Sequence, residues 1–396
     1  MNSGKLSSTG GRGRRVLTLT SLYPPAFKGG GPIRTLEALV RSAPTDVKLA
    51  VVTGDRDVGT ATPLAVDRNT WTFKDGVPCY YASADRLKGL VRMYMTIKAW
   101  QPDLLYLNSF FSRPFSIIPM MLRKLGWCRR VPVLLAPRGE FSPGALELKH
   151  HRKGIYLSGF KLLGLSRGLT WHASTVDEAE HIEAIFGEDA LIVIREDETS
   201  LPGRSAAPEP VESDGLAVVF ISRLDTKKGL DVLLEGIRGT TERIDLDVYG
   251  PETDHRYAIR CRKIASSMPP NVSVNFRGVV AYSEVCSVLA RYELLAFPTA
   301  GENFGHVIAE ALSVSCPVMC SPATPWTRWL EAGGGVIVKP RAWRAWAAAI
   351  DAYAKQTAEE RFVRRINAGR IYNAWCLDAK GPHVFELVGG RASLRW

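Results

Sequence analysis

Long apolar runs and paired cysteines are both scarce in this chain of 396 residues. No apolar run reaches the length of about eighteen residues that a membrane-spanning helix needs. The seven cysteines are scattered and odd in number, and only Cys316 and Cys320 are near neighbours. This pattern favours reduced thiols over a disulfide framework or a zinc site. The first apolar run, Val16–Leu22, is too short and polar for a signal peptide, so we expect a cytoplasmic protein.

Positive charge, in contrast, is in excess. The net charge is +11, and residues 1–200 contribute +8 of it, because they carry 27 Lys and Arg against 19 Asp and Glu. A basic first half indicates either a polyanionic partner, nucleic acid or an anionic membrane face, or an ordinary solubilising surface. The run Lys149–Lys153, KHHRK, precedes an apolar helical stretch that suits a membrane surface or a core helix with one charged face. No aromatic-interleaved basic module is present, so we expect no nucleic-acid partner.

Short β-branched runs alternate with helical patterns in two series. Strand-like runs lie at 15–20, 47–53, 103–108, 131–136 and 191–194, and then at 216–221, 246–249, 272–276, 294–297 and 317–320. Helical patterns fall between them, for example at 32–41, 84–100 and 176–186. Such alternation predicts parallel sheets with helices on both faces. We therefore expect an α/β protein with two doubly wound, Rossmann-like domains that face each other across a ligand-binding cleft.

The domain boundaries follow from composition. Residues 196–215 contain several Pro and Gly among acidic and small residues, which suits a linker. We predict a first domain at 1–198, a linker at 199–214 and a second domain at 215–370. The remainder, 371–396, is predicted to be a C-terminal helix and tail that packs back on the first domain. Beyond about residue 380 the pattern is weak, which is typical of poor order.

A loop and a helix start follow the strand at 294–297. Gly301 and Gly305 allow a ligand to approach the backbone closely, and the first N–H groups of a helix form a phosphate site. Glu302, in the loop, and Glu310, in the helix, could accept hydrogen bonds from the hydroxyls of a sugar and of a ribose. The alternative is that Glu302 caps the helix and Glu310 is a solvated helix residue.

The segment Phe297–Leu312, FPTAGENFGHVIAEAL, resembles the signature of the retaining group-1 (family 4) glycosyltransferases, which have the GT-B fold. That signature has two glutamates separated by seven residues, and Glu302 and Glu310 match the spacing. The resemblance implies that the first contacts the donor sugar and the second the donor ribose. A departure is Ser315, where a glycine is usual. The resemblance also implies donor-binding roles for the neighbouring residues Asn303, Phe304, Gly305 and His306.

The run Ile221–Gly229, ISRLDTKKG, follows the first strand of the second series. In the resembled family an Arg and a Lys hold the donor diphosphate here, which implies that role for Arg223 and Lys228. An Arg fork and a Lys charge can neutralise a leaving diphosphate, so the motif requires no metal. The alternative is two surface cations after a strand. Gly250, after the next strand, is assigned to donor binding as well.

The first domain has a glycine loop directly after its first strand. The backbone amides of Gly29, Gly30 and Gly31 could meet a phosphate or the acceptor, although a glycine triplet is also typical of a plain turn. Its place after the first strand resembles the family's glycine loop near the donor phosphate.

Another candidate loop follows the strand at 131–136. Many relatives have a histidine where Arg138 stands, and we expect Arg138 to bind an anionic donor or acceptor group. Glu140 is expected to take the acceptor proton, since a carboxylate beside an Arg stays ionised. The alternative is a structural pair between these two residues. Asn108 is a further candidate, whereas His172 is expected to be a buried, hydrogen-bonded histidine.

These observations predict a glycosyltransferase whose donor is a nucleotide-diphosphate sugar. The resemblance implies a sugar or lipid-linked oligosaccharide acceptor, no cofactor, no metal, and a role in cell-surface polysaccharide assembly. The protein is expected in the cytoplasm or peripherally on the inner face of the plasma membrane. Two alternatives are a nucleotide-sugar epimerase-like enzyme and a non-catalytic nucleotide-sugar-binding protein on the same fold.

Overall fold

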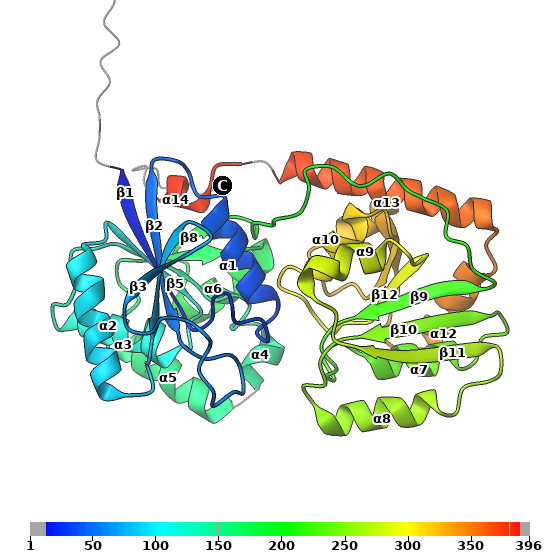
Figure 1. Ribbon diagram of the computed structural model, residues 1–396, viewed down its shortest axis with the longest axis horizontal. Coiled ribbons are helices and arrows are strands. Elements are labelled where there is room, and N and C mark those ends of the chain that lie inside the picture. Colours follow the sequence, from blue (N-terminus) through cyan, green and yellow to red (C-terminus); the bar gives the residue numbers. More distant parts are fainter. Residues whose placement is uncertain (1–12, 148–149, 380, 389–396) are drawn as a thin grey trace, which may run out of the picture. The chain divides into compact units, whose positions relative to one another are not determined.

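The computed structural model describes residues 13–147, 150–379 and 381–388, which form two compact units (Figure 1). The first unit consists of the described parts of 1–199 and 382–396, and the second consists of those of 200–381. The chain therefore passes from one unit to the other twice, after Thr199 and after Gly381. Each unit is built around a sheet, which confirms the predicted α/β class.

The first unit contains eight strands in its described part: β1 (Arg14–Thr20), β2 (Val47–Gly54), β3 (Trp71–Lys74), β4 (Val77–Ala82), β5 (Leu104–Asn108), β6 (Val133–Ala136), β7 (Leu169–Ala173) and β8 (Leu191–Ile194). They form one sheet in the order β3-β4-β2-β1-β5-β6-β7-β8. Neighbouring strands are parallel, except that β3 pairs antiparallel with β4 at the edge. The sequence analysis missed β3, β4 and β7.

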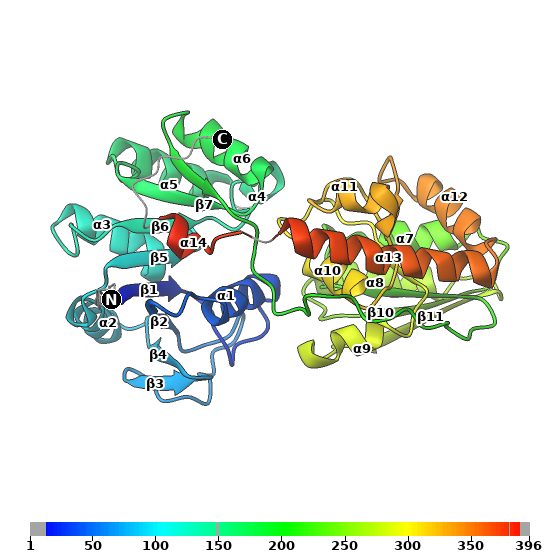
Figure 2. The same ribbon diagram turned by 90° about the horizontal axis from the view of Figure 1, so that it is seen from above.

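Two sets of helices cover the two faces of this sheet (Figure 2). Val16 and Leu17 of β1 are both fully buried, because successive strand residues point to opposite faces and each face is covered. The first face is covered by α1 (Gly31–Arg41) and α14 (Val384–Leu387). The second is covered by α2 (Leu87–Trp100), α3 (Ile118–Lys124), α5 (His150–Leu162) and α6 (Val176–Phe186). A π-helical turn, Arg113–Ile117, precedes α3, and the short α4 (Pro143–Glu147) precedes α5.

The end of the described chain is anchored in the first unit. Val384 and Phe385 of α14 are buried in its core. His383 Nε2 donates a hydrogen bond to Leu39 O at 3.1 Å, and the Arg14 guanidinium donates to Phe385 O at 2.6 Å. The prediction of poor order is therefore wrong for residues 382–388, because two buried apolar side chains hold the short helix α14 in place. The rest of that prediction, 389–396, lies outside the described residues.

The second unit contains six strands among its described residues: β9 (Leu216–Ile221), β10 (Ile244–Tyr249), β11 (Val272–Gly278), β12 (Leu294–Phe297), β13 (Val318–Cys320) and β14 (Gly335–Ile337). They are all parallel, in the order β11-β10-β9-β12-β13-β14. The helices are α7 (Leu230–Ile237), α8 (His255–Ala265), α9 (Val285–Leu289), α10 (His306–Ser313), α11 (Thr327–Trp329), α12 (Trp343–Ala354) and α13 (Ala358–Asp378). Two further helical turns are Tyr282–Glu284 and Leu330–Gly334.

Two predicted boundaries need correction. Residue 370 falls inside α13, which a Thr357–Glu360 capping box begins and which runs without interruption to Asp378. The segment 200–214, predicted to be a linker, belongs to the second unit. Ala206 N donates to Ser313 O at 2.7 Å, and the Ser315 hydroxyl donates to Ala206 O at 2.7 Å. Ser315 has a φ of 57°, so the serine that departs from the usual glycine keeps a left-handed backbone and adds a bond to this segment.

No helix in the ranges that the structure describes is both long and apolar enough to cross a bilayer.

Candidate functional site

The order of the second unit's strands reverses at β9. β10, which follows β9 in the chain, lies on one side of it and β12 on the other. Parallel α/β sheets bind ligands outside the carboxyl ends of their strands at such a reversal of strand order. The loop after β9 carries Arg223 and Lys228, and the loop after β12 carries Glu302. The fold therefore brings these residues from two motifs to the same edge of the sheet.

Lys228 and Glu302 contact each other directly. Lys228 Nζ donates to Glu302 Oε1 at 2.6 Å, and the hydroxyl of the fully buried Thr299 donates to the same oxygen at 2.7 Å. The side chains of the ion pair are only 10% and 12% exposed. Oε2 of Glu302 accepts no hydrogen bond from the residues that the structure describes, so this carboxylate is held in place with one oxygen left for a ligand.

The helix after this loop does not use Glu302 as its cap. The N-cap of α10 is Gly305, with a φ of 85° and no side-chain cap hydrogen bond. The alternative in which Glu302 caps the helix is therefore wrong. Glu310 is also not a solvated helix residue, because only 2% of it is exposed. The first turn of α10 begins without a side-chain cap, which is the arrangement that lets helix N–H groups meet a phosphate.

The remaining donor-side candidates divide between core and surface. Phe304 is buried, and its carbonyl accepts a hydrogen bond from Trp326 Nε1 at 2.6 Å. Asn303 and His306 are partly exposed, and the His306 ring lies 4.8 Å from that of Phe304. Phe304 thus anchors the start of α10 in the core. Asn303 and His306 lie at the surface, close in the chain to Glu302.

Arg341 ties together the two loops that carry the ion pair. Its Nε donates to Pro298 O at 2.5 Å, after β12, and its second terminal nitrogen donates to Thr226 O at 3.0 Å, after β9. The loops also bond directly, from Ala300 N to Lys227 O at 2.7 Å. The sequence analysis missed Arg341, because it lies far along the chain from both motifs and no local pattern marks it.

Three cations stand in the loop after β9. Arg223 is about half exposed and lies 3.6 Å from Asp225, so its guanidinium remains accessible to a ligand. Burial lowers the pKa of Lys227 below its ordinary value, against the opposing effect of Glu302. Lys227 was not among the predicted site residues, although it adjoins Lys228 in the motif. A bound diphosphate would offset the electrostatic repulsion between these neighbouring cations.

At two positions in this region another backbone segment passes so close that only glycine fits. Gly250 has a φ of 140°, and a Cβ there would lie 1.8 Å from Ser222 O. Gly229 has a φ of 78°, and a Cβ there would lie 2.3 Å from Pro298 O. Gly250, predicted to bind the donor, therefore has a packing role that holds the ends of β9 and β10 together.

The glycine loop of the first unit already holds a carboxylate. The amides of Phe27 and Lys28 donate to the buried Asp57 at 2.9 and 3.1 Å. Gly30, with a φ of 66°, is the N-cap of α1. Gly29 and Gly31 flank it in the turn from β1 into the helix. The structure thus places the loop as predicted after β1, but two of its amides are taken up by Asp57.

The side chain of Arg138 is buried within the first unit, and all three of its guanidinium nitrogens have partners. Its Nε donates to Asn108 Oδ1 at 2.9 Å, one terminal nitrogen donates to the Tyr106 hydroxyl at 2.6 Å, and the other pairs with Asp197. The side chains of Arg138 and Asp197 are 6% and 4% exposed. The alternative of a structural pair between Arg138 and Glu140 is wrong, because Asp197 takes that place. Binding of an anionic ligand by Arg138 stays a prediction that this geometry does not favour.

Glu140 joins the loop after β6 to the loop after β5. Its oxygens accept from the Ser109 hydroxyl at 2.7 Å and from the amides of Phe110 and Phe111 at 2.6 and 3.1 Å. Burial raises the pKa of Glu140, and these hydrogen bonds oppose the rise. Its role as the proton acceptor stays a prediction, since both carboxylate oxygens hold backbone or side-chain donors.

His172 confirms the expectation of a buried, satisfied histidine. Its Nδ1 lies 2.9 Å from the Tyr106 hydroxyl and its Nε2 lies 2.9 Å from Arg195 O. Burial, together with the nearby Arg138 cation, lowers the pKa of His172 to about 3. The ring is therefore neutral at physiological pH.

Within 13–147, 150–379 and 381–388, no group of three or more His, Cys, Asp or Glu side chains is placed to hold a metal ion.

Known proteins resemble the chain both in sequence and in fold. Residues 205–370 match the family model described as Glycosyl transferases group 1, so the second unit carries a domain of this kind. A phosphatidyl-myo-inositol mannosyltransferase of Mycobacterium tuberculosis (strain CDC 1551 / Oshkosh) is 27% identical over 214 residues, which cover 52% of this chain and 56% of the relative. The chain thus spans about half the length of this curated relative.

The similarity in fold extends over almost the whole chain. HepE from Anabaena, solved in complex with UDP and glucose, has a TM-score of 0.72 at 16% identity and covers 95% of this chain and 99% of its own. WaaG, a glycosyltransferase involved in lipopolysaccharide biosynthesis, has a TM-score of 0.60 at 12% identity and covers 93% and 100%. The two parallel-sheet units therefore have the GT-B architecture.

Proposed function

We propose that this chain is a retaining glycosyltransferase that moves a sugar from a nucleoside-diphosphate sugar to a hydroxyl acceptor. The observation that carries the proposal is the Lys228–Glu302 pair, at 2.6 Å, inside the region that matches the family model. A cation and a carboxylate on adjoining loops suit a donor with an anionic diphosphate at one end and sugar hydroxyls at the other.

In the proposed reaction the bond between sugar carbon one and the diphosphate oxygen breaks first. Arg223, Lys228 and the uncapped start of α10 stabilise the charge that develops on the leaving diphosphate. Lys228 has three N–H groups, and Glu302 occupies one of them. Glu302 Oε2 accepts a hydroxyl of the sugar, and Glu310 is assigned to the ribose. The acceptor hydroxyl attacks carbon one from the face that the diphosphate leaves, and its proton passes to the departing diphosphate oxygen. The proposal needs no metal, because protein cations neutralise the leaving group.

The identity of the donor and acceptor is proposed from the relatives. HepE was solved with UDP and with UDP-glucose, which makes UDP-sugars the first donors to test. The names of WaaG and of the mannosyltransferase support a sugar or lipid-linked acceptor and a role in cell-surface polysaccharide assembly. We place the reaction on the cytoplasmic side of the membrane.

A panel of UDP-, GDP-, ADP- and dTDP-sugars tests the proposal, read first by thermal shift and then by release of nucleoside diphosphate. One donor class should raise the midpoint of unfolding, since a ligand at about 100 times its Kd adds about 2.7 kcal/mol to stability. Proton NMR of the product should show the anomeric configuration of the donor.

Three results would contradict the proposal in different ways. A donor that binds without turnover with any tested acceptor would favour a non-catalytic binding protein. A donor sugar that changes configuration without transfer would favour an epimerase-like enzyme. Inversion at carbon one would refute retention while leaving transfer intact.

A further inference from the structure

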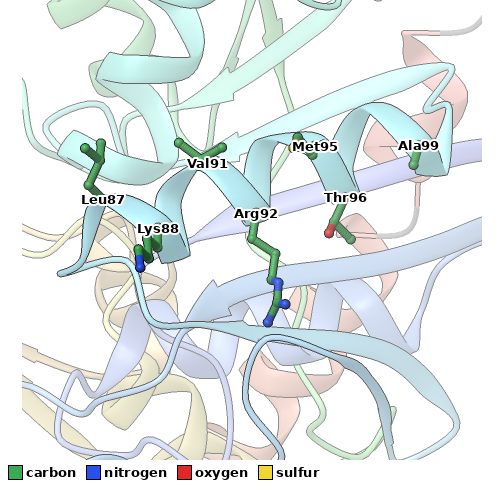
Figure 3. Close-up of a pocket in the computed structure, with 7 residues that line it drawn as sticks. All are labelled: Leu87, Lys88, Val91, Arg92, Met95, Thr96 and Ala99. Atoms are coloured by element: carbon green, nitrogen blue, oxygen red, sulfur yellow. The ribbon is translucent and has the colours of Figure 1, made fainter.

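The outer face of α2 carries large apolar side chains into solvent. Leu87, Val91 and Met95 are 77%, 51% and 68% exposed, one helical turn apart. Figure 3 shows them in a row with Ala99 along the helix, and Lys88, Arg92 and Thr96 line the same shallow hollow. Exposed aliphatic residues in a continuous row are typical of a surface that binds another protein or a membrane.

The cations beside this row have no acidic partners in the part of the chain that the structure describes. Arg86, Lys88, Arg92 and Lys98 are all exposed, and α2 contains no Asp or Glu. None of the four makes an ion pair with a residue that the structure describes. Over residues 86–130 the chain has nine Lys and Arg against Asp103 as its one acidic residue. A surface with unpaired positive charge around an apolar row is complementary to a partner that has an anionic surface and an apolar interior.

The same character continues onto the neighbouring helices. Met121 of α3 and Leu125 just after it are exposed, as are Ile155 and Leu162 of α5. α5 packs other side chains in the core, so the core-helix alternative is confirmed for its inner face. The predicted basic run opens α5, although Lys149 lies outside the described residues.

Contacts show that these three helices share one surface of the first unit. The ammonium of Lys124, at the end of α3, donates to Leu163 O, directly after α5. Trp127, after α3, donates from Nε1 to Tyr94 O of α2 at 3.3 Å. The helices all cover the same face of the sheet. We refer to their exposed residues, Leu87, Val91, Met95, Met121, Leu125, Ile155 and Leu162 with the adjoining cations, as the outer helical face.

We propose that the outer helical face docks on an anionic lipid bilayer. Its aliphatic side chains enter the boundary between headgroups and acyl chains, with α2 in the plane of the surface, while Lys88, Arg92 and Lys98 meet the anionic headgroups. A nucleic acid is a poorer fit, because single-stranded bases stack on aromatic side chains and the exposed row is aliphatic. A second copy of the chain would bring two positive faces together. The inference does not depend on the donor chemistry proposed above.

Flotation of the full chain with vesicles tests the proposal. We expect binding to phosphatidylcholine vesicles that contain about a third phosphatidylglycerol, weak binding to phosphatidylcholine alone, and loss of binding as salt is added. Because each cation near the surface contributes about five-fold, the double variant Lys88→Gln/Arg92→Gln should lower the partition coefficient by about 30-fold. Leu87→Gln/Val91→Gln should weaken binding by at least about 10-fold without changing its salt dependence.

A matched control lies on α8 of the second unit. This helix is also basic, but Arg260 pairs with Asp231 and Arg262 pairs with Glu252. Arg260→Gln/Arg262→Gln removes the same charge as the α2 double variant, and Ile259→Gln removes an apolar side chain that is likewise about half exposed. Neither should change vesicle binding. Thermal unfolding and nucleoside-diphosphate binding of each variant show whether it is folded.

The proposal fails if wild-type chain does not float with the anionic vesicles, or if the α2 and α8 variants lose binding equally. Loss of dimerisation in the α2 variants, without an effect on flotation, would identify the face as an interface between copies. Tighter binding to a nucleic acid that the same variants abolish would assign it to that partner and refute the bilayer. Absence of donor turnover would leave the flotation result unaffected, so failure of the proposed function is distinguishable.

Discussion

At the scale of single residues, the ion pair of the second unit is the feature with the clearest consequence. Lys228 and Glu302 each contact the other, so neither acts independently. We expect Lys228→Ala and Glu302→Gln each to lower kcat/KM by about 100- to 1,000-fold, because each removes a preorganised group from the transition state. The double variant should lose far less than the product of the two effects, because residues that act together are not additive.

Steady-state kinetics on the four members of this mutant cycle measure the coupling. Arg344→Ala provides the control, since its guanidinium lies over the Trp343 ring on α12 and should leave turnover unchanged. If Glu302→Gln retained wild-type turnover, the assignment of the site would be wrong. If the double variant showed fully multiplied losses, the pair would not function as a unit.

His172 predicts a pH dependence of stability in the first unit. Its folded-state pKa of about 3 lies below the ordinary value near 6.5, so between these values the unfolded chain binds a proton that the folded chain does not. The free energy of unfolding should therefore fall as pH falls below about 6.5, by at most about 1.4 kcal/mol per pH unit from this group.

Hydrogen exchange of the β5 and β7 amides, measured between neutral and mildly acidic pH, follows the stability of this unit. His172→Gln should flatten the pH dependence, whatever its effect on stability at neutral pH, because Gln does not titrate. The prediction would be wrong if the wild type and the variant showed the same slope. The comparison isolates His172, since all other groups are shared.

At the scale of elements, Arg341 holds the loops after β9 and β12 in register. We expect Arg341→Met to lower kcat/KM by about 10-fold, because misplacing Lys228 relative to Glu302 weakens transition-state stabilisation. Arg341→Lys should rescue only part of the loss, since one ammonium cannot reproduce the guanidinium fork. In a Lys228→Ala background the further effect of Arg341→Met should disappear. Steady-state kinetics on the wild type, the two single variants and the double variant measure these effects, and titration calorimetry measures donor binding in the same four chains. A lowered melting temperature with unchanged binding and kinetics would show that Arg341 has a purely structural role.

The strands that could be predicted from sequence are those with sustained β-branched runs. β1, β2 and β9 begin and end within one residue of their predicted limits, because each contains at least three β-branched residues, which favour strands. β7 was missed because its sequence, LTWHA, contains two polar residues, and the burial of His172 depends on Tyr106 from another strand. β14 has only three residues and is defined by its pairing with β13.

At the scale of the whole molecule, the second passage of the chain between the units predicts a long-range effect on stability. Phe385 lies after α13 and Gly381, far along the chain from the other residues of the first unit. Its side chain is nevertheless buried in the core of that unit, where its ring contacts that of Tyr106. We expect Phe385→Ala to destabilise the first unit by about 3–5 kcal/mol, since it leaves a cavity in a core. The second unit should be unaffected.

Urea unfolding followed by hydrogen exchange resolves the two units for this test. Leu377→Ala, at an exposed position of α13, is the control and should change stability by less than about 0.5 kcal/mol. Equal destabilisation of both units by Phe385→Ala would contradict the prediction. No change in either unit would show that the return of the chain to the first unit contributes nothing to its stability.

The amino-acid sequence by itself determined the two α/β units, because these follow from local periodicity. The prediction that Arg223, Lys228 and Glu302 form a donor site came from the resemblance of two short motifs to those of the group-1 glycosyltransferases. Only the tertiary structure decided that Lys228 pairs with Glu302, that Arg341 joins their loops, and that Arg138 pairs with Asp197 instead of Glu140. It also decided which side chains of α2 face solvent. Ion pairs and exposure depend on which distant segments the fold places side by side, and no local pattern contains that information.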